Sequence, residues 1–334
     1  MATGAVSRSD LEQALCSGGA SSSVVGDFLA AIAAPLWVDA DRSQLGCRAL
    51  QRTGILGGVV LALYSLPLGY LSPAGVKPLA MSGRFIQQAP RRLFETNRFL
   101  VEVTSPGGMD PGAPGFLITA RVRLMHAVVR HRLQPRWRYD EWGAPINQAH
   151  MASTNLLFSL HALDGLRRLG VRLSAAEVDG YLHLWRHIGH TIGVDDELLC
   201  ATEGDARQLW SLVRAVEEEP DGDCQALARA LVGEAVPQAL SALVPLDLTQ
   251  PRYVKLIFRL STVLLGRPTA HALGYDPQPG PLLISPLLRT LVSGMESVRT
   301  ATPWGDHLMQ SLGAHFNHRL ADAVLADSPA RFVA

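Results

Sequence analysis

The sequence predicts an all-α protein, and three observations support that prediction. Apolar residues recur three and four positions apart along most of the chain, and no stretch shows the sustained alternation typical of half-buried strands. Helix-start and helix-stop signals bracket several of these stretches. With 48% hydrophobic and 18% charged residues among 334, the chain can bury a large core, which excludes disordered, collagen-like and disulfide-stapled proteins.

The longest apolar run covers residues 55–71 and contains three glycines and Pro67. This composition favours a buried helix that packs closely against a neighbour or against a flat ligand. The run is shorter than the roughly 20 apolar residues that a helix needs to cross a bilayer, so we do not expect membrane insertion.

Caps and periodicity mark the helices that follow. Residues 147–169 are predicted to form one helix that ends at Gly170, and Ser174 and Glu177 form a capping box before a helix that reaches about residue 192. Further helices are expected over residues 121–133, 206–216, 225–243, 252–264, 285–298 and 305–325. Because no long linker interrupts this series, we expect a flexible segment over residues 1–24 and one large helical domain over residues 25–334.

The charge balance and the cysteine content indicate which binding partners and which cellular compartment to expect. Thirty basic residues balance thirty acidic ones, so the chain lacks the basic excess that supplies affinity for nucleic acid phosphates. The four cysteines lie far apart without a CxxC pair, which favours reduced thiols. The N-terminal residues show neither a secretory signal nor a transit peptide. We therefore expect a cytoplasmic protein that does not bind nucleic acid.

Several catalytic signatures are missing from the sequence. It contains no GxGxxG after a strand, no GxxxxGK[ST], no GxSxG and no HExxH. It also lacks the ExxH pair of di-iron bundles and the HxD or HxE start of a facial triad. Rossmann oxidoreductases, P-loop NTPases, α/β-hydrolases and zincins are therefore disfavoured. Histidines on helices, and a helical pocket that could hold an organic cofactor, remain.

Three polar residues share one face of the helix predicted over residues 121–133. Arg123, His126 and Arg130 lie at i, i+3 and i+7, with apolar residues beside them, whereas His131 points about 100° away from Arg130 and is expected to face solvent. The pattern fits a solvated basic face. It also fits a haem site, in which a neutral imidazole ligates the iron and the two guanidiniums pair with the propionate carboxylates. Spacing alone leaves both interpretations open.

Blocks of sequence in a fixed order resemble a known family. The blocks cover residues 83–99, 122–130, 143–148, 154–158 and 185–193. They resemble the MpaB/latex-clearing-protein (rubber oxygenase) family of haem oxygenases, over about residues 45–199. The resemblance implies a globin-like helical core that holds a non-covalent b-type haem, iron protoporphyrin IX. The absence of a CxxCH motif agrees with non-covalent attachment.

The resemblance also implies which residues bind the cofactor. His126 takes the position of the family's proximal iron ligand, and Arg123 that of the arginine three residues before it. Arg130, Arg84 and Thr154 are expected to complete the haem-binding set.

On the distal side, Arg92 and Thr96 match the RxxxT pattern of the family, but Glu95 departs from it. The rubber-cleaving members carry a lysine there that can cap the iron. A carboxylate can accept a proton or shape the oxygen pocket but cannot replace an amine ligand, which puts polyisoprene cleavage in doubt. The alternative is a surface glutamate paired with Arg91, Arg92 or Arg98.

The expected activity is oxidative. Ferrous haem would bind O₂ opposite His126, while Arg92, Glu95 and Thr96 set the polarity and proton supply, so that a C=C bond of a small apolar substrate is oxygenated or cleaved. The substrate could be an isoprenoid or a secondary metabolite, and an unidentified electron donor is required. Two alternatives stay open: a non-catalytic haem or lipid carrier or sensor with the same pocket, and a helical scaffold without a cofactor.

A second group of histidines is a candidate metal site. His183, His187 and His190 lie at i, i+4 and i+7 and could bind zinc or another divalent ion. Three such residues are more often partly exposed polar positions without a metal. Trp185 and Ile188 are expected to face the core instead.

Overall fold

The computed structural model describes residues 27–28, 31–81, 89–241, 246–276, 284–302 and 304–313. Within these ranges the regular secondary structure is helical and contains no strand, so the predicted all-α class is confirmed.

The first part of the chain supplies the helices that surround the candidate site. They are α3 (Ala40–Gln51), α4 (Ile55–Val60), the π-helical η1 (Leu61–Ser65), α5 (Leu66–Gly69), α6 (Pro73–Ala80), α7 (Ala89–Val103), α8 (Pro114–Leu133), the 3₁₀ turn η2 (Gln134–Arg136), α9 (Tyr139–Trp142), α10 (Gln148–Phe158) and α11 (Leu160–Leu169). The predicted helix at residues 121–133 is therefore the C-terminal part of α8, which begins at Pro114.

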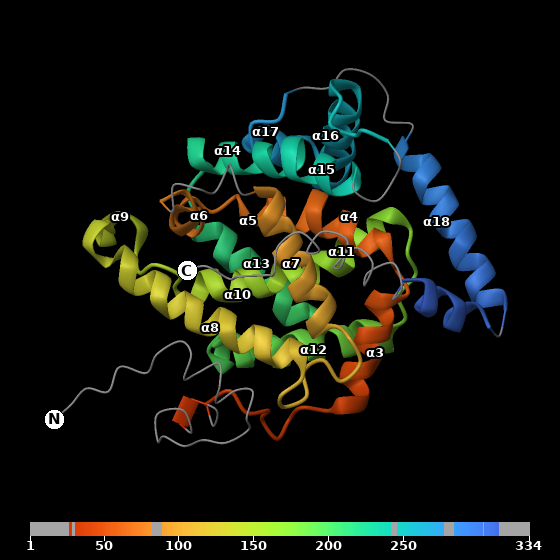
Figure 1. Ribbon diagram of the computed structural model, residues 1–334, viewed down its shortest axis with the longest axis horizontal. Coiled ribbons are helices and arrows are strands. Elements are labelled where there is room, and N and C mark those ends of the chain that lie inside the picture. The colour runs from red at the N-terminus through yellow and green to blue at the C-terminus, as the bar shows by residue number, and fades with distance from the viewer. Residues whose placement is uncertain are drawn as a thin grey trace.

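The second part of the chain covers and flanks this set. Its helices are α12 (Ala175–Ile192), η3 (Asp196–Leu198), α13 (Glu203–Val216), α14 (Gly222–Ala230), the π-helical η4 (Leu231–Ala235), α15 (Val236–Ser241), α16 (Pro251–Leu265), α17 (Arg267–Ala272), α18 (Ile284–Ala301) and a helical stretch over residues 305–313. Figure 1 shows α14 to α17 on one side, α3 and α12 on the other, α7, α10 and α11 between them, and α18 along one flank.

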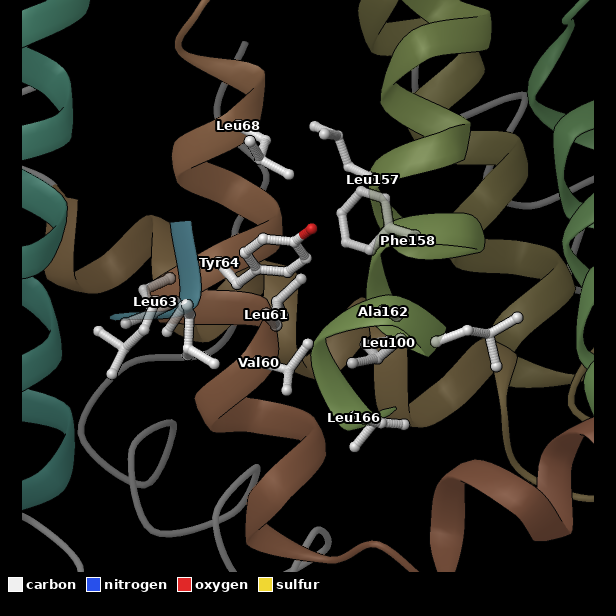
Figure 2. Packing of buried hydrophobic residues seen from close by; sticks show 14 of the residues in the cluster. Val60, Leu61, Leu63, Tyr64, Leu68, Leu100, Leu157, Phe158, Ala162 and Leu166 are labelled. Atoms are coloured by element: carbon white, nitrogen blue, oxygen red, sulfur yellow. The ribbon is translucent and has the colours of Figure 1, made fainter. Parts of the chain in front are cut away.

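The apolar segment at residues 55–71 forms the centre of the core, as predicted. α4, η1 and α5 follow one another without a gap, and every residue of η1 is buried. Figure 2 shows Tyr64 and Leu68 pointing toward Leu157 and Phe158. Because each fully buried side chain of this size contributes about 1.5–3 kcal/mol, this contact anchors α10 and positions the polar residues that α10 carries.

Two glycines allow α3 and α12 to cross in backbone contact. A Cβ atom on Gly46 would lie 2.5 Å from the Gly180 carbonyl oxygen, and one on Gly180 would lie 2.4 Å from the Arg42 carbonyl oxygen. No side chain fits at either position, so this crossing requires glycine on both helices.

The helix predicted over residues 147–169 is in fact two helices, α10 and α11, which meet at Ser159. The Ser159 hydroxyl donates to the carbonyl of Asn155, and the Tyr181 hydroxyl of α12 donates to the carbonyl of Phe158 at 2.8 Å. The Asn155 carbonyl also accepts the Ser159 amide at 3.0 Å, while the Tyr181 bond gives the Phe158 carbonyl a partner from another helix. The predicted stop at Gly170 is confirmed by its left-handed backbone (φ 98°).

The long Gly/Pro segment between α7 and α8 packs onto the protein rather than forming a loose excursion. Met109 is buried, and the amide of Phe116 donates to the carbonyl of Gly108 at 2.9 Å. The hydroxyl of Thr119 lies 3.9 Å from the Met109 sulfur. The segment thereby fixes the start of α8 and the direction in which α8 runs.

No single described helix has the length and hydropathy to span a membrane. α3 and residues Ile55–Gly69 meet that test only as a pair, and they are bent by 85° relative to each other. The described cysteines, Cys47, Cys200 and Cys224, are free thiols, while Cys16 lies outside the described residues.

Candidate functional site

The candidate site is built on one face of α8. Arg123, His126 and Arg130 lie on this face at helical spacing, and all three side chains are partly buried. His131, the next residue after Arg130, is exposed as predicted. The structure therefore corrects the solvated-face interpretation of the stripe.

His126 is held as a neutral imidazole. Burial, and secondarily the positive charge of Arg130, lower the pKa of His126 to about 4. Its Nδ1 atom is buried and has no hydrogen-bond partner among the described residues. A neutral imidazole is the form that ligates metals.

Arg130 connects α8 to the segment before α10. Its Nε and Nη2 atoms donate to the carbonyl oxygen of Ile146 at 3.1 and 2.7 Å, and Nη2 also lies 2.9 Å from the sulfur of Met151. Burial lowers the pKa of Arg130, although the guanidinium stays charged at neutral pH.

Arg123 connects α8 to the C-terminal end of α12. Its Nη1 atom donates to the carbonyl oxygens of His190 and Thr191 at 3.4 and 3.2 Å. Burial, and secondarily the charge of Arg130, lower the pKa of Arg123. Within the described residues, the hydrogen bonds of both guanidiniums end on carbonyl oxygens and a thioether sulfur, and neither guanidinium pairs with a carboxylate.

Arg123 and Arg130 both border a cavity of about 630 Å³. The remaining wall is a mixture of apolar groups, among them Tyr139, Pro145 and Met151, and a few amides. Its size lies within the range of pockets for small molecules and cofactors. Two cations at the edge of a cavity with both polar and apolar walls suit a ligand that combines an apolar body with acidic groups.

The predicted distal residues lie on α7, which packs against α8. Burial lowers the pKa of Arg92, while the nearby Tyr70 and Glu95 partly oppose that effect. Glu95 forms an ion pair with Arg91 one turn earlier, with Nε and Oε1 2.9 Å apart, and its side chain is 18% exposed. The predicted alternative of a glutamate paired with a neighbouring arginine is therefore observed, but this glutamate is largely covered.

Of the two remaining predicted residues, the structure describes Thr154, which does not join the stripe on α8. Thr154 is exposed on α10, and its hydroxyl donates to the carbonyl of His150 in its own helix at 2.8 Å. Arg84 lies outside the described residues.

The structure also identifies residues that sequence reasoning missed. The carbonyl of Ile146 is the main acceptor for Arg130, and Tyr70 lies beside Arg92. Gln148 donates to the carbonyl of Gly193 and accepts from the amide of Asp195. The block at residues 143–148 was visible as a resemblance, but a backbone acceptor has no side-chain signature from which its role could be read.

The histidines of α12 do not form a metal site. Nε2 of His183 accepts the amide of Asp39 at 2.8 Å, and Nδ1 of His190 lies 2.9 Å from Asp196. His183 and His187 are buried, in contrast to the predicted partial exposure, whereas Trp185 and Ile188 face the core as predicted. In the described part of the chain, no three His, Cys, Asp or Glu side chains gather closely enough to hold a metal ion.

Comparisons with known proteins show which family this chain resembles. Residues 48–295 match the sequence model of a family described as ER-bound oxygenase mpaB/B'/rubber oxygenase, catalytic domain. The rubber oxygenase of Streptomyces sp. (strain K30) is 28% identical over an alignment of 260 positions, and the match covers 73% of this chain and 58% of that protein. The chain thus spans little more than half the length of this curated relative.

The structure of latex clearing protein LCP in the closed state has a similar fold. The TM-score is 0.69 and the sequence identity 22%, over 90% of this chain and 80% of that one. Because the family model also covers well over half of the 334 residues, the chain belongs to the family of MpaB and rubber oxygenase catalytic domains.

Proposed function

We propose that this chain is an oxygenase that acts on a C=C bond of an apolar substrate and uses a non-covalent b-type haem held at His126. One observation carries the proposal: a partly buried, neutral imidazole shares one face of α8 with two guanidiniums that have no carboxylate partner among the described residues. The two guanidiniums border a cavity, and His126 lies between them along the helix without belonging to the cavity lining. Family membership supplies the reaction class.

The residues present fit a haem. His126 offers a neutral imidazole whose buried Nδ1 atom has no hydrogen-bond partner among the described residues. Arg123 and Arg130 offer two guanidiniums for two propionates. A carboxylate brings a full negative charge to the guanidinium, whereas a carbonyl oxygen offers only a dipole, so the exchange of carbonyl acceptors for propionates favours binding.

When bound, the haem iron would supply the one-electron and O₂ chemistry that amino-acid side chains lack. The protein supplies orientation and charge. Arg92, buried on α7, would hold a positive charge in a low-dielectric setting, and the hydroxyl of Thr96 one turn later would offer a hydrogen bond. The Glu95 carboxylate, kept in place by Arg91, would accept or return a proton at Oε2.

Other parts of the proposal rest on the resemblance. Arg84 and Thr154 are assigned to the haem-binding set on that basis, and we take residues 25–334 as the catalytic unit. The substrate class is a small apolar molecule such as an isoprenoid, with O₂ as co-substrate and an external reductant as electron donor.

The direct test is the absorption spectrum of the purified protein after addition of hemin, recorded as isolated, reduced and CO-treated. We expect a Soret band of a histidine-ligated b-type haem in the wild type and in His131→Ala, which removes an exposed histidine from the same helix. His126→Ala should lose this ligation. Unchanged haem content and ligation in His126→Ala would refute the assignment.

Turnover needs a separate test. The haem-loaded protein is incubated with an isoprenoid hydrocarbon, a chemical reductant and O₂, and carbonyl products are trapped with a hydrazine reagent. Carbonyl or hydroxylated products that depend on both O₂ and reductant are expected. Haem binding without any oxygenated product from a panel of isoprenoids would contradict the oxygenase and favour a carrier.

A further inference from the structure

Ile146 has an unusual backbone conformation. Its φ is 51°, and it is the one non-glycine residue with a positive φ in the part of the chain that the structure describes. The left-handed region is particularly unfavourable for a β-branched side chain, because Cβ and its branches approach the backbone. Such a conformation persists only where surrounding contacts hold it in place.

Two sets of contacts hold it: the Ile146 side chain packs against an apolar cluster that includes Met151 and Val194, and α8 binds the Ile146 carbonyl. Two nitrogens of the Arg130 guanidinium converge on the Ile146 carbonyl oxygen, at 3.1 and 2.7 Å. On one side of Ile146, Gly143 has a positive φ of 61°; on the other, the Asn147 side chain caps α10 by accepting the amide of His150. The short segment at residues 143–147 is therefore bent between two fixed points and tied to α8 by Arg130.

The same groups line the candidate cavity. Arg130, Pro145, Ile146 and Asn147 all border it. A guanidinium bonded to a neutral carbonyl makes a weaker interaction than one bonded to a carboxylate. A carboxylate that enters the cavity can therefore displace the Ile146 carbonyl from Arg130.

We propose that residues 143–147 form a latch in which the strained Ile146 carbonyl occupies Arg130 until a ligand carboxylate replaces it. Replacement frees the Ile146 peptide to leave its left-handed conformation, so the stored strain adds to the affinity for any ligand that carries a carboxylate. A ligand of the same shape without a carboxylate gains nothing from this release. Ile146 is thus a positioning residue that acts through Arg130 and selects for acidic ligands.

The proposal rests on the proposed function in one respect, because a haem propionate is one source of the carboxylate. A carboxylate on a substrate or product is the other source. The chemistry at Arg130 is the same for both, and separate ligands distinguish them.

The first arm compares hemin with hemin dimethyl ester, which lacks free carboxylates, by Soret titration of the full chain. Ile146→Gly removes the strain because glycine adopts positive φ freely, and Ile146→Val keeps a β-branched side chain at the same place. We expect Ile146→Gly to weaken hemin binding by about tenfold, within the range for one left-handed non-glycine residue, and to leave the ester unchanged. Ile146→Val should behave as the wild type.

The second arm uses decanoate and decanol without any porphyrin and measures hydrogen exchange in peptides that cover residues 143–148. Decanoate should accelerate exchange in the wild type, and decanol should not. Acceleration by hemin but not by decanoate would assign the latch to haem propionates alone.

The outcomes separate the two proposals. Absence of a Soret band in every variant would refute the proposed function, and the decanoate arm would still decide on the latch. The latch is overturned if the ratio of hemin affinity to ester affinity is the same in the wild type and in Ile146→Gly. An equal loss of affinity for both porphyrins is one such result, and it would indicate a simple side-chain contact. If hemin does not bind, unchanged exchange with decanoate overturns it.

Discussion

Replacement of His161 by phenylalanine should remove a defined part of the acid sensitivity of this fold. His161 lies on α11 and is 5% exposed, and neither ring nitrogen has a hydrogen-bond partner among the described residues. Its ring packs edge-on against Trp210, with centroids 4.2 Å apart, and lies 6.0 Å from Tyr64. Phenylalanine preserves these ring contacts and cannot take up a proton.

The size of the effect follows from the pKa. Burial lowers the pKa of His161 from 6.5 to about 4; Asp164 opposes this effect, and the charges of Arg207 and Arg168 reinforce it. Between pH 6.5 and about pH 4, His161 is protonated in the unfolded chain and neutral in the folded chain. The free energy of unfolding therefore decreases as the pH falls through this range. The full loss is about 3 kcal/mol, of which about 2 kcal/mol occurs between pH 7 and pH 5.

Urea unfolding at pH 7 and at pH 5, monitored by far-UV circular dichroism, measures this difference. The wild type should lose about 2 kcal/mol more than His161→Phe between the two pH values. His131→Gln, which changes an exposed histidine, should retain the full wild-type dependence. An equal pH dependence in the wild type and His161→Phe would show that His161 does not resist protonation in the folded state.

Two further substitutions test the packing by urea unfolding. Arg52→Met removes the guanidinium that binds Glu177 and Glu296 at 2.7 and 3.0 Å. We expect the free energy of unfolding to fall by about 3–5 kcal/mol and to recover partly when Glu296→Gln is added. A decrease below about 1 kcal/mol would contradict the role of this buried network. Gly180→Ala should cost about 1–3 kcal/mol, because its Cβ would meet the backbone of α3. Gly294→Ala, which has open space around its Cβ, should be neutral or stabilising, and equal losses in both variants would refute the contact argument.

Local signals in the sequence were sufficient for much of the fold. The capping box of Ser174 and Glu177 and the stop at Gly170 occur where they were predicted, because both depend on residues within one turn of the helix end. The buried position of residues 55–71 followed from composition alone.

Predictions that depended on distant contacts were less successful. The break at Ser159 was missed because Tyr181, more than twenty residues away, supplies the bond that stabilises it. His183 was expected to be partly exposed, yet it is buried, and its ring accepts the amide of Asp39, which lies 144 residues earlier in the chain. Helical periodicity shows which residues share a face and does not show what covers that face.

The sequence by itself determined the helical class, most helix ends and the alignment of Arg123, His126 and Arg130 on one face, because these properties arise from residues a few positions apart. Only the tertiary structure decided that this face is partly buried, that Arg123 meets the end of α12, and that Arg130 holds the Ile146 carbonyl. Burial and backbone acceptors depend on which distant segments meet, and no single segment of sequence specifies that.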